Sequence, residues 1–358
     1  MEKTETKQKR IIITAAIITA IVTAVIFFVY DPFHKADEHI GYAMGSEVVA
    51  YFYGGSNEEI ADTLFSEINV LDTDLLSAKS EKSEIYSLNK KGSQQFSDET
   101  LAYINSSLEI CKASQGALDI TIGSLSSLWG FDTSSDIIPD SALIETEKSY
   151  CGYEKIVLDG NTVTLSENQK LDMGALGKGI ACDKAKDMLS ANGTKRALIS
   201  VGGTILTYSD GNDYYWHDGW DIAVRTPETD DSSPLLKVHV TGAKFFSTSG
   251  DYEKYFEKDG KRYHHILNPE TGYPAETGLK SVTIIADSGL VADGLSTACF
   301  VLGREKSQAL LEEYNAEAIF VDKDNNVYIT DGIFGDCTLL NDAYTVKEYE
   351  KNTFVQKK

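Results

Sequence analysis

The stretch AIFVDKDNNVYIT, residues 318–330, decides the fold, because it holds two short apolar runs on either side of turn-forming residues. The runs are residues 318–321 and 326–330, and the turn is Lys323-Asp324-Asn325, a pattern typical of a β-hairpin. Asp159-Gly160-Asn161 marks a second hairpin turn in the same way. Hairpins join antiparallel strands, so the pattern argues against a purely parallel, doubly wound sheet.

Outward from this hairpin the chain alternates irregularly between the helical period and the strand period. Apolar residues at helical spacing predict helices over 57–76, where Asn57 is the expected cap, 98–114 and 178–192. Strands are expected over 47–53, 155–158, 162–165, 197–201, 220–224, 236–241, 281–286, 318–321 and 326–330. The sequence therefore predicts a mixed α+β fold, with largely antiparallel sheets packed against helices.

The N-terminus contains the one long apolar run of the sequence, residues 11–30, which is preceded by Lys7, Lys9 and Arg10. A run of this length can cross a bilayer as a helix, and the basic residues orient its start toward the cytoplasm. A cleaved signal peptide and a buried core helix are the alternatives, but the bulky end Phe27-Phe28-Val29-Tyr30 favours an uncleaved anchor. We expect a single-pass protein of the cell membrane, with its N-terminus inside and its globular part extracytoplasmic.

This interpretation divides the chain into a cytoplasmic tail (1–10), a transmembrane anchor (11–30), a linker (31–42) and one continuous domain (43–358). The net charge of −22 argues against nucleic acid as a partner, because a phosphate backbone requires a basic surface. The five cysteines include no closely spaced pair that would suggest a zinc site or a redox motif.

Two stretches rich in small and polar residues lie in the first half of the domain. Residues 114–123 (SQGALDITIG) lead into Leu128-Trp129-Gly130-Phe131, and could either bring backbone close to a ligand or simply end a helix before core aromatics. Residues 171–179 (LDMGALGKG) precede a predicted helix, whose first amides and dipole would suit a phosphate. Lys178 would add positive charge there, although an ordinary turn that begins a helix explains the same residues.

Two further stretches lie in the second half. Residues 248–252 (TSGDY) are followed by 264–274 (HHILNPETGYP), where adjacent histidines point to opposite sides, so at most one should face a site. A rigid turn alone would also account for this segment. Asp293 and Thr297, at i and i+4 of a helix start, would offer oxygen ligands on one face to a hard cation such as Mg²⁺. The alternative role of Asp293 is N-terminal capping of that helix.

Taken in order, these stretches resemble the ApbE family of FAD:protein FMN transferases from Ala43-Met44-Gly45 to about Gly303. The matching segments are Ala43-Met44-Gly45, SEIYSLN (83–89), GALDITIG (116–123) with LWGF (128–131), LDMGALGKG (171–179), VGG (201–203), TSGDY (248–252), the HILNPETG turn (265–272) and ADGLST (292–297).

The resemblance implies an enzyme that binds FAD as substrate, uses Mg²⁺, releases AMP and transfers FMN to a Thr or Ser hydroxyl of an acceptor flavin-domain redox protein. By motif position, it assigns the metal ligands to the Ala175 carbonyl, Asp293 and Thr297. It assigns the flavin-nucleotide contacts to Met44, Ala117, Leu118, Asp119, Asp172, Lys178 and Leu267.

Two positions depart from the family pattern. Lys79 stands where members often have an aromatic residue that stacks on the nucleotide, and Ser124 stands where many have proline. The first departure leaves hydrolysis of FAD to FMN and AMP open as an alternative reaction. A non-catalytic FAD-binding module is a separate alternative. Transfer needs a base for the acceptor hydroxyl, and His265 and Asp251 are the two candidates.

Overall fold

The computed structural model describes residues 36–349 except 55–56, 132, 134–135, 212–218 and 232. The predicted cytoplasmic tail and transmembrane anchor, 1–30, lie outside the described residues. Within the part of the chain that is described, no helix combines the length and the apolar character that a bilayer crossing demands.

The helical elements are α2 (Glu58–Val70), the π-helical turn η1 (Leu71–Leu76), α3 (Glu84–Lys91), α4 (Asp98–Ala113), α5 (Gly123–Trp129), α6 (Ser141–Tyr150), the 3₁₀ turn η2 (Tyr153–Lys155), α7 (Gly177–Ala191), α8 (Gly289–Leu302), α9 (Arg304–Glu313) and α10 (Asp331–Phe334). The strands are β1 (Ala36–Ala43), β2 (Ser46–Tyr53), β3 (Ser93–Gln95), β4 (Val157–Asp159), β5 (Thr162–Thr164), β6 (Arg196–Val201), β7 (Thr204–Ser209), β8 (Trp220–Arg225), β9 (Pro234–Val240), β10 (Lys244–Gly250), β11 (Tyr255–Lys258), β12 (Lys261–His264), β13 (Leu279–Ala286), β14 (Glu317–Asp322), β15 (Asn326–Ile329), β16 (Cys337–Leu339) and β17 (Thr345–Glu348).

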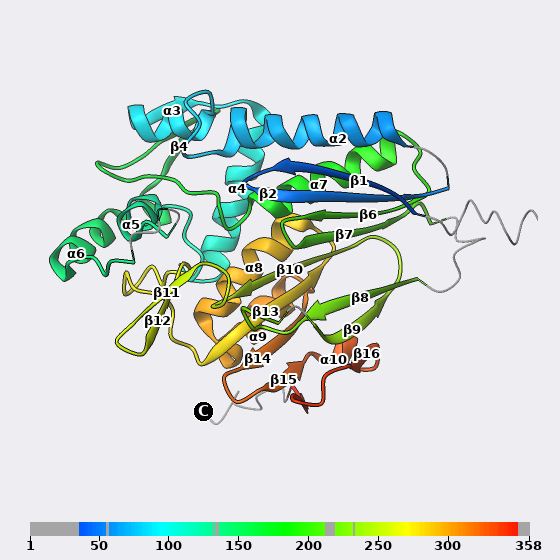
Figure 1. Cartoon of the computed structure of the whole chain (residues 1–358). Coiled ribbons are helices and arrows are strands. Elements are labelled where there is room, and N and C mark those ends of the chain that lie inside the picture. Colours follow the sequence, from blue (N-terminus) through cyan, green and yellow to red (C-terminus); the bar gives the residue numbers. More distant parts are fainter. Residues whose placement is uncertain are drawn as a thin grey trace, which may run out of the picture.

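A nine-stranded sheet forms the centre of the molecule, in the order β1-β2-β6-β7-β10-β13-β14-β15-β17 (Figure 1). Every pairing in it is antiparallel except that of β15 with β17. Helices α7 and α8 pack on one face, and the small sheet β16-β9-β8 packs on the other. The predicted α+β class with largely antiparallel sheets is therefore confirmed.

Alternation along the central strands builds these two cores. On β10, Phe245 packs into the core shared with α7 and α8, whereas the next residue, Phe246, packs against the small sheet. On β13, Ile284 and Ile285 divide in the same way. Because side chains of a strand alternate between faces, Ser247 and Ser249, two and four residues after Phe245, face α8 as Phe245 does.

The hairpin at 318–330 forms as predicted, between β14 and β15. Asp322 holds its turn, because Oδ1 accepts from the amides of Asp324 and Asn326, at 2.9 and 2.8 Å. Asn325 occupies the left-handed region at φ 61°, which asparagine tolerates better than most residues. The hairpin around Gly160 also forms, between β4 and β5.

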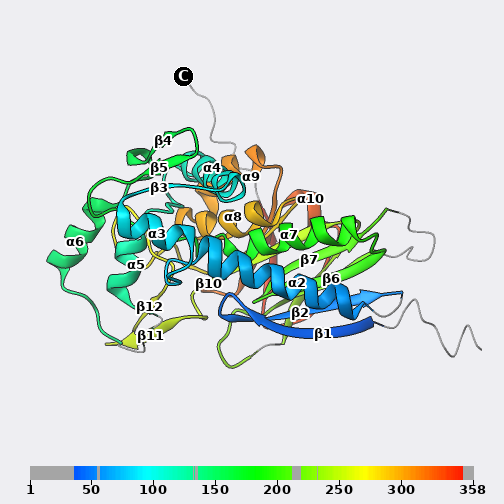
Figure 2. The same ribbon diagram turned by 90° about the horizontal axis from the view of Figure 1, so that it is seen from above.

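The predicted linker over 31–42 is wrong for residues 36–42, because they belong to β1, which pairs along its whole length with β2. Figure 2 shows α2 lying over these two strands. Gly41 is needed on that face, since a Cβ there would lie 2.9 Å from the Phe65 ring of α2. The side chains of β1 alternate between the two faces of the sheet: Ile40 and Tyr42 are exposed, while their neighbours face α2. Sequence reasoning missed this alternation.

The predicted helices form, but the expected cap does not. Helices over 57–76, 98–114 and 178–192 form as α2 with η1, α4 and α7, although Asn57 makes no side-chain capping bond to α2. All five cysteines are free thiols, and Cys182 and Cys299 are buried, as small apolar side chains commonly are.

Helices α7 and α8 cross at a contact between two glycines. A Cβ on Gly179 would lie 2.1 Å from the carbonyl oxygen of Gly289, and a Cβ on Gly289 would lie 2.2 Å from that of Gly179. One turn further along α7, Asp183 accepts hydrogen bonds from the Gly289 and Leu290 amides, both at 2.8 Å. The two helices are therefore locked together at the closest distance that backbone allows.

We predict that Gly179→Ala destabilises the protein by about 3 kcal/mol, because the new methyl group collides with backbone that cannot move aside. Chemical denaturation measures this loss. The matched control is Gly335→Ala, since Gly335 has φ −69° and a Cβ added there would meet no atom within 4 Å. Equal stability of the two variants would contradict the glycine crossing.

Candidate functional site

Asp293 is an interior residue of α8 and not its cap. The N-cap is Ser288, whose side chain accepts from the Val291 amide, so the capping alternative for Asp293 is excluded. Asp293 is buried, with 4% of its surface exposed. A buried carboxylate in a helix needs specific partners, and it finds them on two other elements.

Among the donors that hold the Asp293 carboxylate, two bind one oxygen each. The Gly179 amide at the start of α7 donates to Oδ2 at 2.9 Å, and the Ser247 hydroxyl of β10 donates to Oδ1 at 2.7 Å. Burial raises the pKa of Asp293, while the positive charge of Lys178 and these donors oppose that rise. The glycine crossing is what brings the α7 amide within reach.

Thr297 lies one helical turn after Asp293 and is half-buried. Its hydroxyl oxygen is 3.2 Å from Ser249 Oγ, and Ser249 Oγ is also 2.8 Å from Ser296 Oγ. The expected i, i+4 pair of α8 is therefore present, and both members meet serines of β10.

The loop before α7 is fixed from a distant helix. Asn89 of α3 donates to the Leu171 carbonyl at 2.8 Å and accepts from the Leu171 amide at 2.7 Å. The Asp172 amide then donates to the Ile120 carbonyl at 2.8 Å, which joins two of the predicted stretches. This placement explains why Asn89 belongs to the motif at 83–89.

The Ala175 carbonyl is left without a backbone donor among the described residues. In a regular helix the Gly179 amide would bond to it, but that amide donates to Asp293 instead. The amides of Leu176 and Gly177 bond to Met173. Ala175 thus offers a carbonyl oxygen at the same helix end that contacts Asp293.

The donor set fits Mg²⁺ better than a softer metal. Its members are a carboxylate, a hydroxyl and a carbonyl, all hard oxygen ligands, and Mg²⁺ commonly takes few protein ligands and completes its shell with water and substrate phosphate. Within the described ranges, no group of three or more His, Cys, Asp or Glu side chains is arranged to hold a metal. These residues therefore suit a cation that is shared with a phosphate-bearing ligand.

Lys178 links this centre to the histidine turn. Its Nζ lies 3.5 Å from the Gly202 carbonyl, and its positive charge acts on both Asp293 and His265. The His264 ring donates from Nε2 to the Ala275 carbonyl at 3.0 Å. The Nδ1 atoms of His264 and His265 are both buried without a hydrogen-bond partner in the described part of the chain.

Met44 reaches the same helix end from the β1–β2 turn. Its backbone has φ 54°, and the Asp72 carboxylate of η1 accepts from its amide at 3.1 Å. The Met44 side chain lies 3.9 Å from the position of a Cβ built on Gly177. Met44 is thus held in a strained turn beside the α7 N-terminus.

Three of the predicted nucleotide-contact residues direct their side chains into the protein. Asp119 accepts from Thr121 and from the Tyr153 amide, and Leu118 and Leu267 are each 3% exposed. Their side chains are therefore occupied in packing and in hydrogen bonds within the protein. Ala117 and Asp172 are half-buried at the same edge.

Trp129 carries out the structural role that was the alternative for its stretch. It is buried, stacks on Phe131 with ring centroids 5.6 Å apart, and donates from Nε1 to the Gly272 carbonyl at 2.8 Å. This bond ties the stretch after α4 to the histidine turn. The aromatic residues are core, while the glycine-rich part before them borders the loop at 171–176.

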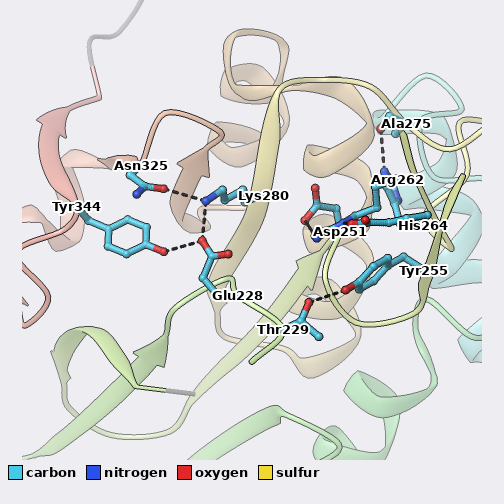
Figure 3. A network of polar contacts seen from close by, with 11 residues as sticks. Glu228, Thr229, Asp251, Tyr255, Arg262, His264, Ala275, Lys280, Asn325 and Tyr344 are labelled. Carbon is cyan, nitrogen blue, oxygen red and sulfur yellow. Dashed lines mark hydrogen bonds and ion pairs between the residues drawn. The ribbon is translucent and has the colours of Figure 1, made fainter. Parts of the chain in front are cut away.

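Asp251 lies in a different polar network, which Figure 3 shows. Its side chain contacts Arg262 at 3.4 Å, and burial raises its pKa against the charge of Arg262. In the same view, Lys280 bonds Glu228 at 2.6 Å. Among the described contacts, no hydrogen bond joins Asp251 to another predicted site residue.

Sequence reasoning placed Ser249 in the candidate stretch 248–252 without giving it a role, and missed two other supporting side chains, Ser247 and Asp72. A signal for the two serines was present in KFFSTSG (244–250), where they continue the face of Phe245 at a spacing of two. Polar residues that follow an apolar one on a buried face require partners. Asp72 carried no comparable signal, because its partner is a backbone amide.

The sequence profile of the ApbE family matches residues 44–320. The chain is 35% identical over 262 residues to an FAD:protein FMN transferase of Treponema pallidum, covering 69% of this chain and 72% of the relative. It is 30% identical over 294 residues to one of Klebsiella pneumoniae, covering 80% and 89%.

Solved structures agree with the sequence relatives. The ApbE protein of Thermotoga maritima superimposes with a TM-score of 0.74 at 29% identity, covering 83% of this chain and 98% of the other. The flavin transferase ApbE of Vibrio cholerae does so with a TM-score of 0.72 at 26% identity, covering 83% and 97%. With the profile, the relatives and the fold in agreement, this chain belongs to the ApbE family.

Proposed function

We propose that the protein is an FAD:protein FMN transferase, which uses Mg²⁺ to move FMN from FAD to a Thr or Ser hydroxyl of an acceptor protein. The observation that supports the proposal is the bond from Gly179 of the α7 N-terminus to Asp293, which brings the segment of Ala175 to the helix that carries Asp293 and Thr297. The names of the relatives support the choice of FAD and protein as the two substrates.

The reaction exchanges one phosphorus–oxygen bond for another. The acceptor oxygen forms a bond to the phosphorus of the FMN half, the bridging bond breaks, and AMP leaves with the bridging oxygen. Mg²⁺ held by Ala175, Asp293 and Thr297 would neutralise charge on the diphosphate. The Lys178 ammonium and the positive end of the α7 dipole suit the same anion, because both present positive charge at a helix N-terminus.

His265 is the residue that we assign as base for the acceptor hydroxyl. Burial and the charges of Lys254 and Lys178 lower its pKa to about 4, so the imidazole is neutral near pH 7 and can accept a proton. Asp251 is the weaker candidate, because its carboxylate faces Arg262. Lys178 acts on His265 and on Asp293 alike, which supports a common centre for both.

We predict that the His265 imidazole titrates with a pKa of about 4 in the ligand-free protein, followed by NMR and assigned by its loss in His265→Gln. Above that pH it stays neutral, so base function is kept through neutral pH and is lost as the pH falls through about 4. A titration near the ordinary value of 6.5 would contradict the environment described for this side chain.

We predict that His265→Gln slows adduct formation by about a hundredfold to ten-thousandfold, the usual contribution of a general base. Asp251→Asn should slow it far less. His239→Gln serves as the matched control, since His239 lies on β9 against exposed Asp221, 3.0 Å away. If Asp251→Asn were the slower of the two variants, the assignment of the base would pass to Asp251.

We predict that Asp293→Ala abolishes turnover, with a loss of at least about a thousandfold, and leaves the fold intact. The assay is mass spectrometry of an acceptor flavin domain for an FMN adduct on Thr or Ser, with and without Mg²⁺. Asp287→Ala is the control, because Asp287 precedes α8 at the surface and pairs only with Lys244 among the described contacts. Wild-type turnover of Asp293→Ala that still required Mg²⁺ would show that the ligand is misassigned.

The same assay separates the alternative reactions. AMP released without an acceptor, at the rate seen with one, would indicate FAD hydrolysis. FAD that stayed intact after long incubation with Mg²⁺ and acceptor would indicate a binding module. Lys79 is the reason for testing hydrolysis: it stands where family members often have a stacking ring, and its side chain is exposed.

We further propose that the acceptor is a redox protein outside the cytoplasm, reached from a single-pass membrane anchor at residues 11–30. The apolar run and the basic residues before it support this topology. Protease treatment of intact and of opened cells tests it: the domain should be cleaved in both, and protection in intact cells would contradict it.

A further inference from the structure

A chain of three hydroxyl groups connects Thr297 to the backbone of its own helix. Thr297 Oγ1 is 3.2 Å from Ser249 Oγ, Ser249 Oγ is 2.8 Å from Ser296 Oγ, and Ser296 Oγ is 2.8 Å from the Asp293 carbonyl oxygen. Ser296 is 1% exposed, and Ser249 and Thr297 are half-buried. The order of protons in this chain can be worked out from its buried end.

A carbonyl oxygen only accepts, so the single proton of Ser296 must point to Asp293. Ser296 has then no proton left for Ser249, and Ser249 must donate to Ser296. Ser249 in turn has none left for Thr297, and Thr297 must donate to Ser249. Each hydroxyl has one proton to give, so the direction of all three bonds is determined.

The consequence concerns the lone pairs of Thr297. With its proton directed at Ser249, the Thr297 oxygen exposes lone pairs and no hydrogen on its remaining side. A hard cation is repelled by a hydroxyl proton and attracted by the lone pairs, so this orientation is the one in which Thr297 serves as a ligand. A freely rotating hydroxyl would spend part of its time in the wrong orientation.

A similar order holds for the second side-chain ligand. The Asp293 carboxylate only accepts, so Ser247 donates to Oδ1. Thr204 Oγ1 lies 3.2 Å from Ser247 Oγ and also hydrogen-bonds the Asp293 carboxylate, so it is a further donor to this pair. Ser247 and Ser249 share one face of β10, so a single strand orients both side-chain oxygens of α8.

We infer that Ser249 and Ser296 are positioning residues of the metal site, which fix the Thr297 proton away from a bound divalent cation. The inference rests on the proposed function, because it takes Thr297 to be a ligand. Neither serine needs to touch the cation. Supporting residues of this kind commonly change metal affinity by about ten- to a hundredfold.

The test measures cation affinity directly, by titrating Mn²⁺ as a stand-in for Mg²⁺ and following free Mn²⁺ by electron paramagnetic resonance, with FAD present and acceptor absent. Ser249→Ala should weaken Mn²⁺ binding by about tenfold or more, because Thr297 loses the acceptor that held its proton. Thr248→Ala is the matched control. It removes a hydroxyl from the next residue of β10, which pairs with Thr283 at 2.8 Å on the opposite face, and should bind Mn²⁺ as the wild type does.

Ser296→Ala gives the sharper result, because the Ser296 hydroxyl reaches that of Thr297 only through Ser249. Without Ser296 as acceptor, Ser249 is free to donate toward Thr297 and reverse the order. We expect weaker Mn²⁺ binding here too, and in both serine variants a thermal midpoint like that of the wild type. A purely structural role predicts lowered midpoints and wild-type affinity in both variants, which would overturn the inference.

Thr297→Ala separates this inference from the proposed site. If Thr297→Ala weakens Mn²⁺ binding, then adding Ser249→Ala to it should cause no further loss, because there is no hydroxyl left to orient. If Thr297→Ala weakens binding but the two serine variants do not, the proton order is wrong and the metal site stands. If Thr297→Ala binds Mn²⁺ as the wild type does, the metal site itself is wrong.

Discussion

The contact of Gly179 with Gly289 is the constraint on which the rest of the site depends. It lets α7 and α8 approach until a backbone amide of one helix bonds a side chain of the other, and Asp183 fixes their rotation from the next turn. Bulkier residues would separate the helices, and the Asp293 carboxylate would lose its α7 donor. A buried charge without its donors would be costly, so the packing of two glycines determines whether the acidic ligand can exist.

The central sheet supplies the other half of this arrangement. Strand β10 contributes Phe245 to the helical core and then, on the same face, the serines that meet α8. Packing and ligand support are therefore continuous along one strand, and Phe246 on its other face packs against the small sheet. A polar network also joins the central sheet to the C-terminal segment, because Glu228 accepts hydrogen bonds from Lys280 of β13 and from Tyr344.

Much of this fold was predictable, because alternation and turn residues are local. The hairpin at Lys323-Asp324-Asn325 and the helices α4 and α7 follow from their own segments. The strand over residues 36–42 was not predicted, since a strand next to a predicted membrane segment is hard to tell from a linker. Within the site, the pairing of Asp293 with Thr297 followed from helical spacing. The contact of Asp293 with Gly179 could not be predicted in this way, because only tertiary packing joins residues so distant in sequence.

The sequence separation of these contacts has a consequence for folding. The bond from Gly179 to Asp293 spans 114 residues, and that from Asn89 to Leu171 spans 82. Contacts of such separation form only after costly closure of long loops, so they are late events of folding. The oxygens of the site therefore come together only after these long loops have closed. A ligand that binds them adds stability to the native state alone, and partly folded chains gain nothing from it.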